Sequence, residues 1–466
     1  MYWLDLEQDF RQLLSLCNFS MAIKNFINIF NEKSDNIAII HNQNKYKYKD
    51  LFDRIKKYEN SVSLKQCATG EIIAINSDFN FTSISLIFFL IIRSCIILPI
   101  YNKKNNEKEK FLNISQANKV INIDKDQNIL IENLKNDSKN NLIKKLRSDK
   151  SPGLILFSSG SSGSPKAAVH NFNNLLLKFH KIRPPLTAIN FLLFDHWGGL
   201  NTMFHILSNG GKLVIINDRT PEIIAKAIED NKANLLPASP TFLNLLILSD
   251  IHKKYNLKSL EIISYGTEPM PETTLLKLKS IFPNVKLQQT YGLIEVGVLR
   301  SKSESDNSLW VKVGGEGYKI RIVDGLLEIK AISAMLGYLN APNPFTKDGW
   351  YKTGDKVLEK KGYIKILGRK SEVINVGGEK VYPQEIENEI LSIENVKDVS
   401  VFSEKNAFIG NIICANISLK KPEDKSIFKE KMIDYLSNRI SKYKIPVKVN
   451  FMIDVGHTSR FKKKRN

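Results

Sequence analysis

Short apolar runs recur along the first 290 residues of the chain and alternate with longer stretches of helical character. Within residues 1–150 these runs are "NIAIIHN", "EIIAINS", "CIILPIY" and "KVINIDK"; beyond them come "GLILFSS", "KLVIIND", "ANLLPAS", "LEIISYG" and "VKLQQTYG". Such alternation is typical of a parallel sheet joined by crossover helices. We therefore expect an α/β fold here, with ligands bound beyond the carboxyl ends of the strands.

The sequence pattern changes near Gly314. Runs such as "YKIRIVDG", "LLEIKAI" and "GYIKILG" are separated by Gly or Asp-Gly turns, which predicts antiparallel hairpins. A further α/β segment follows: helix "PQEIENEILSI", strands "VKDVSVFSE" and "NIICANISL", and helix "SIFKEKMIDYLSNRISKY". Because 466 residues exceed one ordinary core, we expect two domains, 1–369 and 370–466, with the boundary at residues 369–372.

Composition favours a cytoplasmic protein. The four cysteines form no CxxC pair, which indicates a reducing compartment and argues against disulfides or a zinc site. The first eight residues lack the basic segment of a signal peptide. The apolar segment "SLIFFLIIRSCIILPI" contains Arg93 and is shorter than the roughly 20 residues of a spanning helix. We expect it to be a buried helix followed by a buried strand, without stable membrane insertion.

The formal net charge of +20 leaves two interpretations open. Lysines are spread along the whole chain and no repeated basic motif stands out, which favours an ordinary Lys-rich protein without a nucleic-acid partner. The tail "RFKKKRN" is the exception, and it supports the alternative of a nucleic-acid or membrane-surface partner.

The stretch "FSSGSSGSPKAAV", residues 157–169, is too small and flexible to build a core. A Gly/Ser loop after a strand can direct N–H groups and hydroxyls at phosphate oxygens, and Lys166 adds a positive charge. Its spacing does not match the P-loop pattern GxxxxGK[ST]. Taken alone, the stretch could also be a solvated linker.

The longer segment "LFSSGSSGSPKAAVH" closely resembles the phosphate loop of the adenylate-forming (AMP-binding) superfamily, which includes acyl-CoA synthetases, luciferases and peptide-synthetase adenylation domains. Four further segments resemble that family's motifs in its order: "QQTYGLIEVG", "GWYKTGD", "GRKSEVINVGGEKVYPQEIE" and "HTSRFKKKR". The acyl-CoA synthetase branch is the most similar. The resemblance implies a large N-terminal domain of stacked α/β subdomains with a β-rich portion, and a small mobile α+β C-terminal domain.

The resemblance also implies an ATP-dependent acid–thiol ligase. A carboxylate would attack the α-phosphorus of ATP, and CoA would then capture the acyl-adenylate. The carboxylate is already ionised, so the reaction needs charge neutralisation and alignment rather than a base. Two alternatives stay open: a ligase that loads an acyl or amino-acid group onto the phosphopantetheine of a carrier protein, and a catalytically decayed nucleic-acid-binding or scaffold protein.

The resemblance also implies which residues would bind ATP and its metal ion. Glu295 would hold Mg²⁺ through its carboxylate, as hard cations prefer. The other implied nucleotide residues are Ser158, Ser159, Gly160, Ser161, Ser162, Gly163 and Lys166 at the phosphates, Gly266, Thr267, Glu268, Thr290, Tyr291 and Gly292 near the adenine, and Asp355 and Arg369 at the ribose.

"FDHWGGLNT" resembles the "FHxGGLN" segment of acyl-CoA synthetases. His196 would border the substrate carboxylate, with Trp197 and Gly198 at the acyl pocket; a structural histidine at a helix start is the alternative. Amino-acid-activating members of the family place an aspartate near Asp195 to bind an ammonium group. The register that aligns His196 with the family histidine favours a plain carboxylic acid.

In "NVGGEK", Gly377 and Gly378 would let a thin thiol chain pass close to the backbone, and Ser371 occupies the implied hinge. Ile294 departs from the family, which usually has Thr or Ser there to contact the α-phosphate. The missing hydrogen bond costs roughly 1.5–3 kcal/mol unless a water or Thr290 replaces it.

The terminal lysines generate a prediction. Lys462 occupies the place of the family's catalytic lysine, although Phe461 stands where the family has glycine. An ammonium between the carboxylate and the α-phosphate lowers their repulsion, so Lys462→Ala should slow adenylate formation on the order of 10²–10³-fold. Conversion of supplied acyl-adenylate to thioester should persist. Lys463→Ala and Lys464→Ala are the controls; a larger loss in either would show that the register is shifted.

Overall fold

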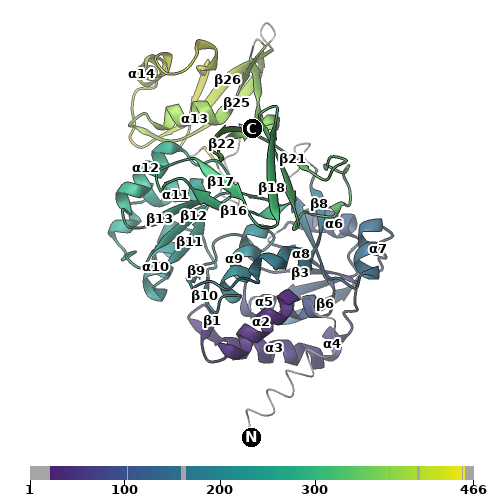
Figure 1. Ribbon diagram of the computed structural model, residues 1–466. Helices are drawn as coiled ribbons and strands as arrows, with labels where there is room; N and C mark the ends of the chain where they lie inside the picture. The colour runs from purple at the N-terminus through teal and green to yellow at the C-terminus, as the bar shows by residue number, and fades with distance from the viewer. Residues whose placement is uncertain are drawn as a thin grey trace. The chain divides into compact units, whose positions relative to one another are not determined.

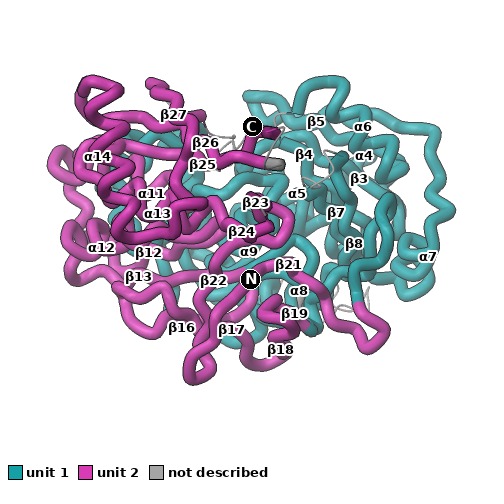
Figure 2. The backbone as a smooth tube through the Cα atoms, turned by 90° about the horizontal axis from the view of Figure 1, so that it is seen from above, with its two compact units in different colours: residues 1–237, 292–298, 330–345 teal, residues 238–291, 299–329, 346–466 magenta. Residues whose placement is uncertain are grey.

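The structure is a computed structural model that describes residues 21–101, 103–158, 164–376, 378–406, 410–453 and 455–456. The chain forms two compact units, coloured teal and magenta in Figure 2. Unit 1 comprises residues 1–237, 292–298 and 330–345; unit 2 comprises residues 238–291, 299–329 and 346–466. Each unit is therefore built from several separate stretches of the sequence.

Unit 1 contains a seven-stranded sheet in the order β20-β8-β7-β4-β3-β5-β6. Its strands are β3 (Ile72–Asn76), β4 (Ile96–Ile100), β5 (Lys119–Ile123), β6 (Ile129–Asn133), β7 (Gly153–Ser158), β8 (Lys166–Asn171) and β20 (Gly337–Tyr338). The central strands β5, β3, β4 and β7 are parallel, which confirms the predicted α/β pattern. β6, β8 and β20 are antiparallel additions that the sequence did not predict.

A second group of strands in unit 1 runs in the order β11-β9-β10-β1-β2. These strands are β1 (Ile37–His41), β2 (Asn44–Lys47), β9 (Thr187–Ile189), β10 (Lys212–Ile215) and β11 (Leu235–Ala238). Only β2 pairs antiparallel, while β1, β10, β9 and β11 are parallel neighbours. The carboxyl ends of these four strands therefore lie at one edge.

The helices of unit 1 connect and cover these strands (Figure 1). They are α2 (Met21–Glu32), α3 (Tyr48–Asn60), α4 (Val62–Lys65), α5 (Phe81–Ile92), α6 (Asn105–Ser115), α7 (Asn141–Ser148), α8 (Phe172–Leu176), α9 (Trp197–Leu207) and α10 (Pro221–Asn231). Every residue of α5 is buried, and the buried strand β4 follows it, as predicted. Among the described residues, no helix has the length and apolar character needed to cross a membrane.

An aromatic cluster ties four of these helices together. Phe26 on α2 lies 5.4 Å from Phe88 on α5 and 5.6 Å from Phe204 on α9, measured between ring centroids. Phe204 also lies 5.6 Å from Phe172 on α8. Tilted and edge-to-face pairs at these separations stabilise a core beyond their buried area. The cluster thereby fixes α9, whose first turn carries three of the predicted site residues.

Unit 2 begins with a parallel pair and two helices: α11 (Pro240–Leu248), β12 (Ile262–Tyr265), α12 (Glu272–Ile281) and β13 (Lys286–Gln289). An antiparallel sheet in the order β16-β17-β22-β21-β19-β18 follows. Its strands are β16 (Arg300–Ser303), β17 (Val311–Gly314), β18 (Tyr318–Val323), β19 (Leu326–Ala331), β21 (Tyr351–Lys360) and β22 (Tyr363–Arg369). The Gly and Asp-Gly turns predicted these hairpins correctly.

The C-terminal part of unit 2 has its own hydrophobic core, which includes Val399, Ile417, Phe428 and Met432. Its elements are β23 (Ile374–Val376), β24 (Glu379–Val381), α13 (Pro383–Leu391), β25 (Val396–Asn406), β26 (Gly410–Leu419), α14 (Lys425–Ser437) and β27 (Lys448–Phe451). The predicted second helix is shorter than expected, because α14 ends at a cap on Asn438. The domain boundary at residues 369–372 stays a prediction.

Candidate active site

Three of the predicted nucleotide residues meet in unit 2 around the carboxylate of Asp355. Asp355 on β21 is opposite Arg369 on β22, and the Arg369 Nε donates a hydrogen bond of 3.1 Å to Oδ1. The hydroxyl of Tyr291, two residues beyond β13, donates to Oδ2. Asp355 and Tyr291 are only 4% and 6% exposed. The structure therefore brings together residues that the sequence separates by up to 78 positions.

The backbone that carries Asp355 is fixed by Thr353, which the sequence analysis did not identify. The Asp355 N–H donates to Thr353 Oγ1 at 2.9 Å, and that hydroxyl donates to the Leu327 carbonyl at 2.7 Å. Gly354 between them has φ +74°, a conformation that glycine adopts without strain. The Thr-Gly-Asp sequence thus determines the local backbone conformation that orients the Asp355 carboxylate.

Burial, reinforced by the Asp355 carboxylate, raises the pKa of Tyr291 well above its ordinary value. The phenol is therefore a neutral donor throughout the physiological range. An ionised carboxylate offers about four acceptor positions, of which Tyr291 and Arg369 occupy two. The remaining positions suit a ligand that presents a pair of donors, such as adjacent hydroxyls.

The ends of β12 and β13 approach each other closely at Gly266. A Cβ there would lie 2.5 Å from Thr290 Oγ1 and 2.7 Å from the Thr290 carbonyl oxygen, so only glycine fits. Both the N–H and the hydroxyl of Thr290 donate to the Tyr265 carbonyl, at 2.7 and 3.0 Å. The single hydroxyl proton of Thr290 is thus used between the ends of β12 and β13 in this structure, and its replacement of the contact missing at Ile294 stays a prediction.

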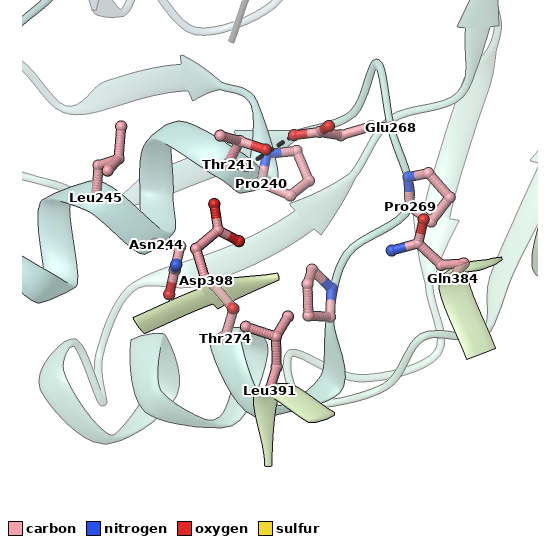
Figure 3. Close-up of a pocket in the computed structure, with 11 residues that line it drawn as sticks. Pro240, Thr241, Asn244, Leu245, Glu268, Pro269, Thr274, Gln384, Leu391 and Asp398 are labelled. Atoms are coloured by element: carbon pink, nitrogen blue, oxygen red, sulfur yellow. Dashed lines mark hydrogen bonds between the residues drawn. The ribbon is translucent and has the colours of Figure 1, made fainter. Parts of the chain in front are cut away.

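Glu268 has a structural contact in this structure. Its Oε1 accepts a hydrogen bond of 2.8 Å from the Thr241 N–H in the first turn of α11, drawn as the dashed line in Figure 3. The neighbouring Thr267 has a positive φ of +74°. Beside them lies a pocket lined by Pro240, Thr241, Asn244, Leu245, Glu268, Pro269, Pro271, Thr274, Gln384, Leu391 and Asp398. Nucleotide binding by Thr267 and Glu268 stays a prediction.

In unit 1, Glu295 lies in the turn between β14 (Gly292–Leu293) and β15 (Gly297–Val298). It is 7% exposed, and its Oε1 accepts a hydrogen bond of 2.7 Å from the Tyr338 hydroxyl. Gly292 is needed at this turn because a Cβ would lie 2.9 Å from the Gly297 carbonyl oxygen. Tyr338 was not identified from the sequence.

One carboxylate is compatible with Mg²⁺, which proteins commonly bind through one or two carboxylates together with substrate phosphates. Glu295 fits this donor chemistry. Within the described parts of the chain, no three His, Cys, Asp or Glu side chains gather as a dedicated metal site. Glu295 is therefore a candidate for a metal that arrives with a ligand.

The predicted phosphate loop connects two antiparallel strands, because Ser158 at the end of β7 is opposite Lys166 at the start of β8. β7 is parallel to β4, so Ser158, where the predicted loop begins, lies at the carboxyl edge of the sheet, as expected. Residues Ser159, Gly160, Ser161, Ser162 and Gly163 lie outside the described residues, as do Gly377 and Lys462.

His196 is the N-cap of α9, and its Nδ1 accepts a hydrogen bond of 3.0 Å from the Gly198 N–H. The neutral ring therefore carries its proton on Nε2. Gly198 is closely packed, since a Cβ would lie 2.6 Å from a methyl group of Leu192. Trp197 is 2% exposed, and its indole N–H has no hydrogen-bond partner among the described residues. The acyl-site roles of these residues stay predictions.

Two ion pairs lie beside this helix start. Asp195, 4% exposed, pairs with Lys103 at 3.6 Å, and Arg219 pairs with Asp78 at 3.5 Å. Burial raises the pKa of Asp78, and the Arg219 guanidinium partly opposes this effect. Lys103 also pairs with Glu107 on α6, at 3.5 Å, so this group contains three acids and two cations.

The hinge and thiol-loop candidates lie in exposed backbone of unit 2. Ser371 lies in a single 3₁₀ turn, Lys370–Glu372. Gly378 lies between the short strands β23 and β24 with φ +93°, and no atom lies within 4 Å of a Cβ built there. The positive φ, rather than crowding, is what favours glycine at this position.

Comparison with known protein families gives two matches. Residues 28–328 match the family model described as AMP-binding enzyme, and residues 385–462 match that of the AMP-binding enzyme C-terminal domain. Similar curated proteins include 4-coumarate–CoA ligase-like 9 of Arabidopsis thaliana, 27% identical over 65% of this chain, and acyl-CoA synthetase 7 of Caenorhabditis elegans, 27% identical over 71%. The matched parts span only 58% and 66% of those two proteins.

Solved structures share the fold. ATP-bound MatB from Rhodopseudomonas palustris superposes with a TM-score of 0.78 at 20% identity, covering 94% of this chain and 96% of that one. The anthranilate CoA ligase AuaEII in complex with anthranoyl-AMP gives 0.80 at 16% identity, covering 97% of both chains. These likenesses confirm the predicted fold class.

The Lys103–Asp195 pair generates a stability prediction. Lys103→Met removes the cation beside the buried Asp195 and also beside the more exposed Glu107, so it should lower the free energy of unfolding by up to about 3 kcal/mol. Chemical denaturation measures this. Lys47→Met, in a pair with the exposed Asp35, is the control and should cost less than about 1 kcal/mol. Equal costs would show that the Lys103–Asp195 contact is not formed.

Proposed function

Because the chain belongs to the AMP-binding enzyme family, we propose that it is an ATP-dependent ligase that joins a carboxylic acid to the thiol of CoA. The observation that carries this proposal is the buried Asp355 carboxylate, held by Tyr291 and Arg369 with acceptor positions left over. The two ribose hydroxyls of ATP are adjacent donors of the kind that such a carboxylate binds.

The proposed reaction has two steps. First, an oxygen of the substrate carboxylate bonds to the α-phosphorus of ATP while the bond to pyrophosphate breaks. Then the CoA sulfur bonds to the acyl carbon while the bond to the AMP oxygen breaks, and the thiol proton passes to solvent. Both steps bring negatively charged groups together, so the protein must supply cations and fixed donors.

Ser158 and Lys166 flank the loop that would bind the β- and γ-phosphates. Glu295 would hold Mg²⁺, which would neutralise charge on the phosphate oxygens when bound. Tyr291 would lie against the adenine, with its ring fixed by the hydrogen bond to Asp355. Tyr291 and Glu295 are separated by only three residues of the chain, which supports the proposal that both serve one nucleotide.

His196 would face the substrate carboxylate and can donate from Nε2, because Nδ1 is occupied by the Gly198 N–H. Lys462 would bridge that carboxylate and the α-phosphate. The Lys103–Asp195 pair supports a plain carboxylic acid rather than an amino acid, since the Asp195 carboxylate already faces an ammonium group. The identity of the acyl chain is a matter for experiment.

CoA is the proposed acceptor because similar proteins are named for it. Indoleacetate–CoA ligase of Aromatoleum aromaticum, for example, is 26% identical over 66% of this chain. A carrier-protein phosphopantetheine would present the same thiol chemistry and is the second acceptor to test.

A pyrophosphate-release screen tests the proposed reaction. We expect release with at least one of a panel of short, aromatic, hydroxylated and long-chain acids, and thioester only when CoA is added. Asp355→Ala should weaken ATP binding by roughly tenfold or more, because it removes hydrogen bonds to a charged group. Asp230→Ala, at an exposed helix ion pair, is the control. Salt-dependent DNA binding without pyrophosphate release from any acid would favour the nucleic-acid alternative.

A second prediction separates the two half-reactions. Gly378→Leu should reduce thioester formation by at least about tenfold and leave adenylate formation within about threefold, because the loop would act only after the C-terminal domain rotates. Gly362→Leu is a matched control: this glycine also has a positive φ, +74°, and an open Cβ position, but it lies in the β21–β22 turn. Equal loss of both half-reactions in Gly378→Leu would contradict this division.

A further inference from the structure

We propose that Tyr338 is a positioning residue that orients Glu295 through its hydroxyl and Lys166 through its ring, and so couples the metal carboxylate to the phosphate-loop lysine. This inference rests on the proposed function, because it assigns Mg²⁺ to Glu295 and phosphates to Lys166. Tyr338 needs no contact with substrate for this role.

The hydroxyl contact is specific. Tyr338 donates to Glu295 Oε1 at 2.7 Å, a normal length for a hydrogen bond from a hydroxyl to a carboxylate. Glu295 is 7% exposed, so water competes little for that oxygen. One oxygen of the carboxylate is thereby held in a fixed direction, which leaves the other available to a metal ion.

The backbone places Tyr338 next to the phosphate loop. β20 pairs antiparallel with β8, so that Tyr338 is opposite Ala168. The pairing is extended on both sides by hydrogen bonds from the Leu336 N–H to Val169 and from the Leu339 N–H to Ala167, at 2.7 and 2.9 Å. The position of Tyr338 is therefore set by the strand that leaves the loop.

The same register brings the ring to Lys166. Lys166 lies two residues before Ala168 on β8, so both side chains point to the face of the sheet that Tyr338 occupies. Lys166 and Tyr338 are thus diagonal neighbours across the strands, which long side chains can bridge. The Lys166 Nζ lies 5.7 Å from the centroid of the Tyr338 ring, within the range of a cation–π contact.

The segment before Tyr338 also holds the backbone of the Glu295 turn. The Met335 N–H donates to the Glu295 carbonyl at 2.8 Å, and the Ser333 hydroxyl donates to the Val296 carbonyl at 2.6 Å. His170 on β8 lies beside the backbone of Ile294 and Ser333. Burial lowers the pKa of its imidazole to about 4, so the ring is neutral. Backbone and side chain of Glu295 are thus both fixed by residues 333–338.

Metal binding tests the hydroxyl directly. Tyr338→Phe keeps the ring and removes only the hydroxyl, so it should weaken binding of Mn²⁺, measured by electron paramagnetic resonance with a non-hydrolysable ATP analogue, by about 10–100-fold. Saturating Mg²⁺ should restore most of the adenylation rate. Tyr46→Phe is the matched control, because its ring stacks on Phe81 in unit 1, and it should match the wild type.

A double-mutant cycle separates positioning from a general structural effect. In a Glu295→Gln background, Tyr338→Phe should change Mn²⁺ binding by less than about twofold, because the group through which it acts is altered. Tyr338→Leu also removes the ring, so it should additionally weaken metal-free ATP binding by about two- to fivefold, the size of an exposed cation–π contact. Thermal denaturation checks that each variant is folded.

Two outcomes would overturn the inference. Wild-type Mn²⁺ affinity in a folded Tyr338→Phe would show that the hydroxyl does not orient Glu295. An equally large effect of Tyr338→Phe with and without the Glu295 carboxylate would show a structural role only. Failure of the proposed function is distinguishable, because the wild-type protein itself would then bind neither the ATP analogue nor Mn²⁺ with it.

Discussion

The pairing of β8 with β7 on one side and β20 on the other is the interaction on which the arrangement of unit 1 depends. It makes β7 and β8, the strands before and after the Gly/Ser stretch, antiparallel neighbours. It also brings residues 333–340, from the far end of unit 1's sequence, against the strand that leaves the loop. Through that contact Lys166 and Glu295, 129 positions apart, meet at one tyrosine.

Motif and periodicity predicted the central parallel strands, the hairpins of unit 2, the buried α5 and the Tyr291–Asp355–Arg369 grouping. They did not predict β20 or the contacts of Tyr338, because a two-residue edge strand has no periodicity and its partner is remote in sequence. The hydrogen bond of Thr353 to the Leu327 carbonyl and the ion pair of Lys103 with Asp195 were missed for a related reason, because each joins residues that are remote in sequence. The predicted length of the second C-terminal helix was wrong, because α14 ends at Ser437 with Asn438 as its C-cap.

Three acids that the sequence analysis singled out, two in unit 1 and one in unit 2, are each held by a hydrogen-bond donor or a cation. Asp355 is held by a neutral phenol and a guanidinium, Glu295 by a neutral phenol, and Asp195 by an ammonium. Buried carboxylates without a hydrogen-bond donor or cation would be costly. Neutral donors such as Tyr291 orient a carboxylate without cancelling its charge, which leaves that charge available to a metal ion or to ribose hydroxyls.

The division of the chain into units has a consequence for its synthesis. The polypeptide crosses between the units at residues 237/238, 291/292, 298/299, 329/330 and 345/346. A domain encoded by one continuous segment can begin to fold as soon as it leaves the ribosome. Unit 1 can be completed only later, because β20, its edge strand beside β8, is translated about 100 residues after β11. Until β20 is translated, the edge of β8 that it pairs with lacks that partner and can pair with another strand instead.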